Sequence, residues 1–351
     1  MNEIERYQFD LNGYIIVKKI LSDEEVRRYL AVVEAKEDHF RNTIDDEPRM
    51  VGFANIPYRF DEKNQCFAYK HMGGGGLQLV IDDFLNISPE FDSIVGHPRT
   101  MAYVDEMCVG PNWIGSSEIR YRFKSNETHT HMGGHMDMRN RYQFAGVKMY
   151  DSAASVWRVR DFDLAAVRVL YALHDMPEDY GPLCVIPGSH KSNFFSPYAD
   201  QEPMKEPGMV PLTLEAGDAI FFTENLRHGG FPNLRDTARK TLHIMYSPRW
   251  AASQSPLHWN DRVYVTPQAW DRYSEAQRAV LPPPAQAFEL ELRMQHQKVE
   301  AQKRQIEAQQ QELATLRSEV AGLRAQLARA AGAPAGSSGS NRSLLGKIMG
   351  R

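Results

Sequence analysis

The chain has 351 residues, of which 42% are hydrophobic and 10% aromatic, so it can bury a substantial packed core. Its formal net charge of -4 argues against a general nucleic-acid binder, which usually carries a basic excess. The three cysteines, Cys66, Cys108 and Cys184, form no closely spaced pair, which disfavours a disulfide framework and a thiolate zinc site and fits a reducing compartment.

The sequence shows neither the pattern of a secretory signal peptide nor that of a transmembrane helix. The first residues contain no basic region followed by an apolar run, and the sequence has no stretch of about 18 apolar residues. We therefore expect a cytoplasmic protein without a transmembrane segment.

Residues 1 to about 250 alternate short apolar runs with Gly, Pro and Asn, which predicts a mainly β body with flanking helices. Ser22, followed by Glu25 and an apolar-periodic run to Val33, predicts a capped helix. Residues 52–76, with a run of four glycines, and residues 138–163 have weak periodicity, and we interpret them as active-site loops or lids, with a plain flexible connector as the alternative for the glycine run. The predicted strands are Gly13 to Val17, Ser117 to Phe123, Ala166 to Leu173, Leu183 to Ile186, Ala219 to Thr223 and Thr241 to Ser247.

Two histidines and one carboxylate form a candidate iron site. In an extended segment alternate side chains share a face, so His135 and Asp137 can both reach one metal ion. With His228 from a distant strand they would complete a facial triad, which leaves positions open for a co-substrate and dioxygen. The His-x-acid spacing alone is weak, since chance gives roughly one to two such matches in a chain with 12 His and 45 Asp+Glu.

Three surrounding segments resemble the phytanoyl-CoA dioxygenase family of iron(II)/2-oxoglutarate oxygenases. The first runs from Tyr7 through Gly13-Tyr-Ile-Ile-Val to the helix start at Ser22. The second is Gly181-Pro-Leu-Cys-Val-Ile-Pro-Gly-Ser-His190, and the third begins at Gly217-Asp, contains His228-Gly-Gly and ends at Arg239. The resemblance covers residues about 5 to 250 and implies a double-stranded β-helix, a jelly-roll or cupin-like barrel.

The resemblance also implies roles for individual residues. His135, Asp137 and His228 match the family's catalytic iron ligands, and Arg239 matches its anchor for 2-oxoglutarate. A guanidinium fork suits a carboxylate in bidentate fashion, which fits that anchoring role. The implied cofactors are Fe(II), 2-oxoglutarate as co-substrate and dioxygen, and the implied activity is hydroxylation of a small molecule. Asp137 stands where related halogenases have a small residue, so halogenation is disfavoured.

One position departs from the family pattern. The family often has Ser or Thr two residues after the distal histidine, where this chain has Gly230. Thr241 and His243 share strand parity with Arg239 and are the expected replacements for that contact, with Thr241 as the predicted second cofactor-binding residue.

Other histidines leave a second enzyme class open. His190 is interpreted as a structural hydrogen-bond partner beside the site. His129 and His131, followed by His135, also resemble the metal cluster of a cupin, so a cupin-type epimerase or a dioxygenase independent of 2-oxoglutarate is the alternative. Such an enzyme would not need Arg239. We expect His129 and His131 to lie on the approach to the metal.

The C-terminal part changes character after Leu281-Pro-Pro-Pro. Apolar residues recur every seven positions from Leu292 to Leu327, which predicts a coiled coil over 285–330 and a homo-oligomer formed through residues 288–327. Glu312 and Glu319 at g positions, with Arg317 and Arg324 at the following e positions, favour a parallel pair. A single solvated helix, and an inactive oxygenase-fold scaffold that recruits partners through the coiled coil, are the alternatives.

The predicted domains are therefore an oxygenase domain at 1–280, the coiled coil at 285–330 and a flexible tail at 331–351. The basic residues near the triad weakly indicate an anionic or polyhydroxylated substrate, although most of them are interpreted as solvated loop side chains. These residues are Arg120, Arg122, Lys124, Arg139, Arg141, Arg158 and Arg160.

Overall fold

The computed structural model describes residues 1–44, 59–73, 76–108, 110–124, 148–151, 156–159, 162, 164–192, 194, 196–198, 203–251, 263–284 and 287–331. The chain divides into two compact units, Met1–Gln297 and Lys298–Arg351. The described helices are α1 (Glu3–Asn12), α2 (Asp23–Thr43), α3 (Pro98–Met107), α4 (Pro267–Arg272), α5 (Glu275–Arg278) and α6 (Ala287–Ala331), with short 3-10 turns η2 (Phe84–Asn86), η3 (Pro89–Ile94), η5 (Ser189–Lys191) and η6 (Pro203–Lys205).

Three antiparallel sheets make up the β body within the described residues. The largest has the order β1-β11-β8-β13-β5-β4-β3-β2, the second β10-β9-β12, and the third pairs β6 with β7. The strands are β1 (Tyr14–Val17), β2 (Arg59–Asp61), β3 (Cys66–Gly73), β4 (Gly76–Asp82), β5 (Asn112–Arg122), β6 (Lys148–Asp151), β7 (Val156–Val159), β8 (Val167–Ala172), β9 (Leu183–Val185), β10 (Val210–Pro211), β11 (Ala219–Thr223), β12 (His228–Gly230) and β13 (Arg239–Pro248).

The predicted fold class, mainly β with flanking helices, is confirmed. Each of the six predicted strands coincides with an observed one, and β5 begins earlier than expected, at Asn112. The predicted helix is α2, whose N-cap Ser22 and Glu25 form the expected capping box.

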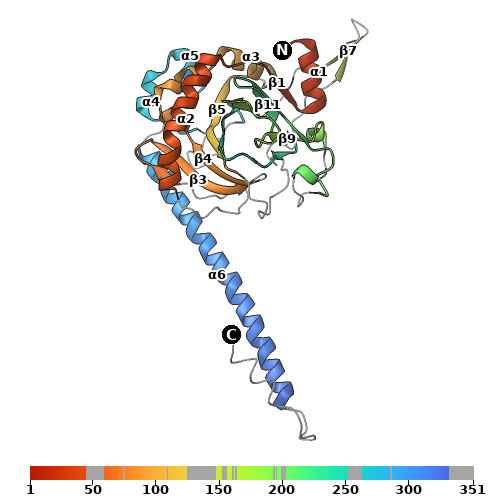
Figure 1. The fold of residues 1–351 in the computed structure, drawn as a ribbon, viewed down its shortest axis with the longest axis vertical. Coiled ribbons are helices and arrows are strands. Elements are labelled where there is room, and N and C mark those ends of the chain that lie inside the picture. The colour runs from red at the N-terminus through yellow and green to blue at the C-terminus, as the bar shows by residue number, and fades with distance from the viewer. Residues whose placement is uncertain are drawn as a thin grey trace. The chain divides into compact units, whose positions relative to one another are not determined.

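Helices cover the outer face of the large sheet. Val26, Tyr29, Val33 and Phe40 recur along one face of α2 and are buried. The Tyr121 hydroxyl donates to the Val33 carbonyl at 2.7 Å, which fixes α2 against β5. Alternate residues of β4, β5, β8, β11 and β13 complete this core, since side chains at every second position share a face. In Figure 1, α2 lies on one side of the large sheet and β9 on the other.

The opposite, inner face of the large sheet has an apolar part and a polar part. Over β8 and β11 it is largely apolar and packs against the smaller sheet through Leu170, Ala172, Ile220, Phe222, Leu183 and Val185. Over β5 and β13 it is polar at alternating positions, where Arg120 is half-buried and the others are buried: Glu118, Arg122, Arg239, Thr241 and His243. The two sheets thus enclose the interior of the jelly-roll body, and part of that interior is lined by charges.

The segment interpreted as a loop at 52–76 is corrected by the structure. β3 and β4 form an antiparallel hairpin whose last register pair is Gly73 with Gly76, so both outer glycines of the run belong to strands. Residues 52–58, 74 and 75 lie outside the described residues. Phe67, Tyr69, Leu79 and Ile81 are buried on its two strands. Mixed apolar and polar residues on both faces hid the alternation that normally marks a strand. Within 138–163, β6 and β7 pair with each other, and most other residues lie outside the described ones.

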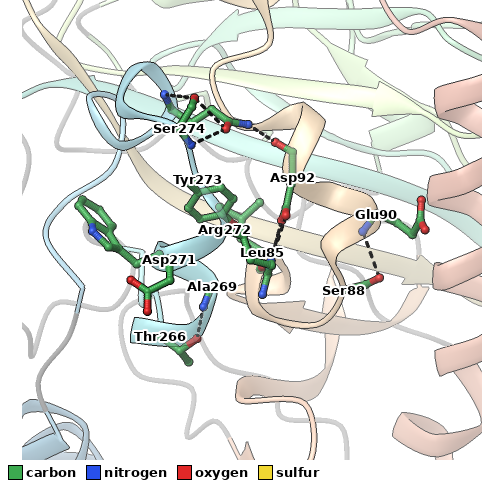
Figure 2. Close-up of polar contacts among 12 residues, drawn as sticks. Leu85, Ser88, Glu90, Asp92, Thr266, Ala269, Asp271, Arg272, Tyr273 and Ser274 are labelled. Atoms are coloured by element: carbon green, nitrogen blue, oxygen red, sulfur yellow. Dashed lines mark hydrogen bonds and ion pairs between the residues drawn. The ribbon is translucent and has the colours of Figure 1, made fainter.

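Residues 263–281 belong to the first unit and complete its core. Arg272 of α4 donates to the Asp92 carboxylate at 3.0 Å and to the Leu85 carbonyl at 3.1 Å, as Figure 2 shows. Ser274 caps α5, and Gln277 Nε2 donates to the Asp92 carbonyl at 2.7 Å. These contacts hold α4 and α5 on the turns that precede α3.

A long helix is present where the coiled coil is predicted. α6 has 45 residues, and at 1.5 Å per residue it is about 67 Å long. Among the helices in the described ranges, none combines the length and apolarity that crossing a membrane requires.

Candidate active site

Two predicted iron ligands, His135 and Asp137, lie outside the described residues, as do His129 and His131. The structure therefore does not test the triad as a set. It does describe the third predicted ligand, His228, and the predicted co-substrate residues Arg239 and Thr241, all of which are buried.

His228 opens β12 in the smaller sheet and is held in one orientation. Its Nδ1 lies 2.7 Å from the Leu226 carbonyl, and its ring meets Phe222 of β11 edge-on at a centroid distance of 5.1 Å. Because a carbonyl only accepts, Nδ1 must carry the proton, and Nε2 then carries the lone pair of the neutral ring. Burial lowers the pKa of His228, against the opposing effect of Glu224, so the neutral form prevails.

The start of β12 is fixed by a buried ion pair. Arg227 binds Glu206 through Nε at 2.5 Å and through Nη2 at 2.8 Å, a bidentate arrangement. The Arg227 backbone N–H donates to Ser189 Oγ at 2.8 Å, so the Pro-Gly-Ser-His turn positions the residue before His228. His190 Nε2 donates to the Asp10 carbonyl at 3.1 Å, which confirms its predicted role as a hydrogen-bond partner.

Arg239, Thr241 and His243 occupy alternate inward positions of β13, as strand parity predicts. Arg239 donates to the Gly181 carbonyl at 2.8 Å and to Thr241 Oγ1 at 3.3 Å. Thr241 Oγ1 lies 3.0 Å from His243 Nε2, so the three side chains form a row. Two buried nitrogens of this row, Arg239 Nε and His243 Nδ1, have no hydrogen-bond partner among the described residues. Burial and the nearby Arg122 and Arg120 hold the pKa of Arg239 well below its usual value.

A four-membered ion network lies beside this row. Glu118 receives Arg120 at 2.5 Å and Arg168 at 2.9 Å, and Arg168 also pairs with Glu224. Burial alone would raise the pKa of Glu118, but Arg120 and Arg168 outweigh it and set the pKa at about 2. Two guanidinium groups and two carboxylates thus balance in charge.

Arg122 stands directly opposite Arg239 in the register of β5 and β13. Its guanidinium donates to the Phe231 carbonyl at 3.1 Å. A Cβ atom on Gly230 would lie 2.5 Å from Arg122 Cζ, so the arginine fills the space that a side chain at 230 would need. Gly181 is constrained too: its φ is +66°, and a Cβ there would lie 2.9 Å from Arg122 Cδ.

The sequence reading missed this charged lining. Arg122 is buried on the inner face of β5, and Arg120 is half-buried there and paired with Glu118, so neither is a freely solvated side chain. Lys124 is exposed and pairs with Asp236 at 2.8 Å, as a solvated side chain would. Arg139, Arg141 and Arg160 lie outside the described residues, and so does the side chain of Arg158. The strict alternation of charged and apolar residues from 118 to 122 was the available signal.

The described residues fit both groups that the resemblance implies. A metal-binding histidine must be neutral, with its other nitrogen bonded to a carbonyl or carboxylate, and His228 meets this requirement. A buried guanidinium facing a second one, with no carboxylate bonded to Arg239 in the described part of the chain, suits an anionic ligand. No cluster of three metal-binding side chains occurs among the described residues, two predicted ligands being outside them.

A family model described as phytanoyl-CoA dioxygenase matches residues 9–241, more than half of the 351 residues. The chain belongs to the phytanoyl-CoA dioxygenase family. The match covers β1 through the first part of β13 and includes every predicted site residue. Family membership confirms the resemblance seen in the three sequence segments, and with it the double-stranded β-helix fold.

Two curated relatives of the family are similar over most of the chain. "Dioxygenase trt7" of Aspergillus terreus is 26% identical over 68% of this chain and 70% of its own length. "Ectoine dioxygenase" of Bordetella bronchiseptica is 22% identical over 73% of this chain and 80% of its own.

Two solved structures align at lower similarity. HygX of Streptomyces hygroscopicus, with nickel, 2-oxoglutarate and hygromycin B bound, gives a TM-score of 0.49 at 17% identity over 71% of this chain and 88% of its own. EctD of S. alaskensis, with 2-oxoglutarate and 5-hydroxyectoine, gives 0.49 at 19% identity over 72% and 78%. Because both TM-scores lie below 0.5, the fold assignment stands on the sheets of this chain and on the family match.

Proposed function

We propose that the protein is an iron(II)- and 2-oxoglutarate-dependent oxygenase that hydroxylates a small molecule. The family to which it belongs uses iron(II), 2-oxoglutarate and dioxygen. The observation that carries the proposal is the buried Arg239, which lies opposite Arg122 on the neighbouring strand β5. The neutral His228 is buried in the same β body. Buried cations in such an arrangement are stabilised by an anionic ligand.

His135, Asp137 and His228 are the residues that would hold the iron. Bound there, iron(II) would supply the activation of dioxygen and the oxidation of a C–H bond, with 2-oxoglutarate as the source of two electrons. The Leu226 carbonyl keeps His228 in the tautomer whose Nε2 can bind metal.

Arg239 would bind the distal carboxylate of 2-oxoglutarate and so orient the oxoacid. Its fork is already directed by Gly181 and Thr241, which lowers the entropy that binding must overcome. Thr241 adds a hydroxyl on the same strand face, and His243 holds that hydroxyl in place. The apolar lining over β8 and β11 excludes water from the reacting end, which strengthens charge interactions inside.

The same geometry bears on the alternative enzyme class. A cupin-type epimerase or a dioxygenase independent of 2-oxoglutarate has no need of a buried arginine on this strand, and placing one there without a ligand destabilises the fold. Arg239 therefore favours the 2-oxoglutarate-dependent reaction.

A small metabolite or biosynthetic intermediate is the proposed substrate class, in line with a relative that is named for ectoine. The proposed location is the cytoplasm, since Cys66, Cys108 and Cys184 are buried free thiols.

The proposal predicts iron-dependent release of succinate from 2-oxoglutarate. The purified chain, loaded anaerobically with iron(II), is supplied with 2-oxoglutarate, dioxygen and a panel of metabolites, and succinate and product mass are measured. We expect one compound class to raise succinate release and to gain 16 mass units, and Asp137→Ala to abolish both.

An exposed carboxylate provides the matched control, because Glu90→Ala should leave succinate release unchanged. Wild-type protein that binds iron(II) but never consumes 2-oxoglutarate would support the cupin-type alternative. Protein that binds neither would support the inactive scaffold.

A further inference from the structure

Arg122 occupies the place of a side chain that the family often has at position 230. Gly230 leaves no room for a hydroxyl-bearing residue, because the Arg122 guanidinium lies where its Cβ would be. A serine at 230 would clash with Arg122. In turn, the Arg122 side chain fits only because positions 230 and 181 are both glycine. One group of hydrogen-bond donors has therefore replaced another at the same point in space.

The pairing of Arg122 with Arg239 is unfavourable by itself. Directly opposed residues on neighbouring antiparallel strands have Cβ atoms about 4.5–5.5 Å apart, and like charges in that arrangement destabilise a sheet. Both side chains are also nearly inaccessible to solvent, at 5% exposure for Arg122 and 2% for Arg239. Arg122 donates to the Phe231 carbonyl and Arg239 to the Gly181 carbonyl, and both of these acceptors are neutral.

A single carboxylate between the two guanidinium groups would be attracted to both, so it would outweigh the repulsion between Arg122 and Arg239. Burial, with Cys184 opposing and Arg120 adding to it, lowers the pKa of Arg122 to about 10, which still leaves it charged at neutral pH. Two arginines can bind one carboxylate through both of its oxygens, each oxygen accepting from more than one donor.

We propose that Arg122 binds the distal carboxylate of 2-oxoglutarate together with Arg239, in place of the hydroxyl that the family often supplies from position 230. This inference rests on the proposed function. It assigns the second contact of the co-substrate to an arginine of β5, and leaves Thr241 to orient Arg239.

The test compares two oxoacids that differ in the distal carboxylate. Binding of 2-oxoglutarate and of 2-oxobutyrate to the nickel(II)-loaded full chain is measured by calorimetry. We expect Arg122→Met to weaken 2-oxoglutarate about 10- to 150-fold, the range for losing a hydrogen bond to a charged group, and to leave 2-oxobutyrate unchanged. Arg239→Met should show the same selectivity.

Lys124→Met is the matched control, because it removes a cation two residues further along, where the side chain is exposed, and should change neither affinity. Gly230→Ser in an Arg122→Ala background should recover part of the lost 2-oxoglutarate affinity. If Arg122→Met does not fold, Arg122→Lys should show a smaller loss that is again confined to 2-oxoglutarate.

The outcomes separate the two proposals. Equal weakening of both oxoacids would assign Arg122 to holding the Phe231 carbonyl and would overturn this inference alone. Wild-type protein that binds nickel(II) but neither oxoacid would overturn the proposed function, and this inference with it.

A separate observation concerns α6. Its described side chains include an exposed apolar series at heptad spacing, which is unusual for a solvated helix. The series comprises Ile306, Leu313, Leu316, Val320, Leu323 and Leu327, each between 47% and 70% exposed. In the single chain this series, which we call the seam, has no covering element among the described residues.

The charges beside the seam match a parallel second copy. With the seam at a and d positions, Glu312 and Glu319 fall at g, and Arg317 and Arg324 fall at e five residues later. In a parallel two-stranded coiled coil, g of one helix meets the following e of the other, so each glutamate would face an arginine. An antiparallel pair would not bring these positions together.

We infer that the seam is covered by the seam of a second copy of this chain, as a parallel coiled coil. From Leu313 to Leu327, each apolar a or d side chain then packs between residues of the facing helix, in knobs-into-holes fashion. Four interchain ion pairs flank this stretch.

Sedimentation equilibrium of the full chain tests this pairing. We expect the mass of two chains for the wild type and of one chain for the double variant Leu313→Glu with Val320→Glu. Ala314→Glu with Ser318→Glu adds the same charge on the opposite face of α6 and should remain paired. A wild type that is monomeric, or seam and control variants that behave alike, would overturn the inference.

Orientation is tested by charge exchange. A chain with Arg317→Glu and Arg324→Glu should pair weakly with itself, and so should a chain with Glu312→Arg and Glu319→Arg. Mixing the two should restore stable pairs in the parallel arrangement. Failure of the mixture to recover would contradict parallel pairing.

Discussion

Replacing His228 with alanine should weaken iron(II) binding by more than about 100-fold and abolish succinate release. Loss of a residue that only orients a metal ligand already costs about 10- to 100-fold in metal affinity, so loss of a ligand must exceed that range. The variant also leaves the Leu226 carbonyl without its 2.7 Å partner, which adds a modest loss of stability. Calorimetric titration of the metal-free chain with iron(II) under anaerobic conditions measures the first effect, and thermal unfolding the second.

His190 supplies the matched control for this experiment. Its ring packs against Gly13 and bonds to the Asp10 carbonyl, so His190→Ala should destabilise the fold by about 0.5–3 kcal/mol and leave the iron affinity of the folded protein unchanged. We therefore expect iron affinity to fall in His228→Ala and to stay unchanged in His190→Ala. If both variants lose iron equally, or His228→Ala retains it, His228 is not a ligand.

Replacing Glu118 with glutamine should destabilise the fold by about 3–5 kcal/mol, the usual cost of removing one partner of a buried ion pair. The amide keeps the shape of the carboxyl group but removes the charge that Arg120 and Arg168 share, which leaves Glu224, the partner of Arg168, as the carboxylate of this network. Urea unfolding measures the change. Glu90→Gln, at an exposed pair with Arg28, should stay within about 0.5 kcal/mol of the wild type.

Acid titration gives an independent check on Glu118. Its folded pKa of about 2 lies below the ordinary value of 4.5, so ionised Glu118 stabilises the fold above pH 4.5, and this contribution is lost as the pH falls towards 2. The difference in unfolding free energy between wild type and Glu118→Gln should therefore shrink over that window. A difference that stays constant down to pH 2 would show that the carboxylate charge does not matter.

Much of the barrel could be predicted from the sequence because its strands carry unbroken apolar or alternating runs. β8, β9, β11 and β13 were placed to within two residues, and so were the inward positions of Arg239, Thr241 and His243. The hairpin of β3 and β4 was missed because the glycine run indicated a loop, whereas Gly73 and Gly76 are paired strand residues.

The charged lining could not be placed from the sequence for a different reason. A period of two divides a strand into two faces but does not say which face is inside. Charged residues usually mark the solvent side, yet Glu118, Arg120 and Arg122 face the interior because the apolar face of β5 packs against α2. The partners Arg168 and Glu224 come from 50 or more residues further along, a pairing that no local pattern reveals.

The place of β13 in the large sheet bears on how this protein can change over evolution. From Thr241 to Tyr246, β13 is paired with β8 on one side and β5 on the other, Arg239 is paired with β5, and the opposite face of the strand is in the core, so the backbone under both residues is held in place. Substitutions in the connecting segments leave that backbone untouched. New substrate preferences can therefore arise by drift in the connections while the oxoacid requirement is inherited unchanged.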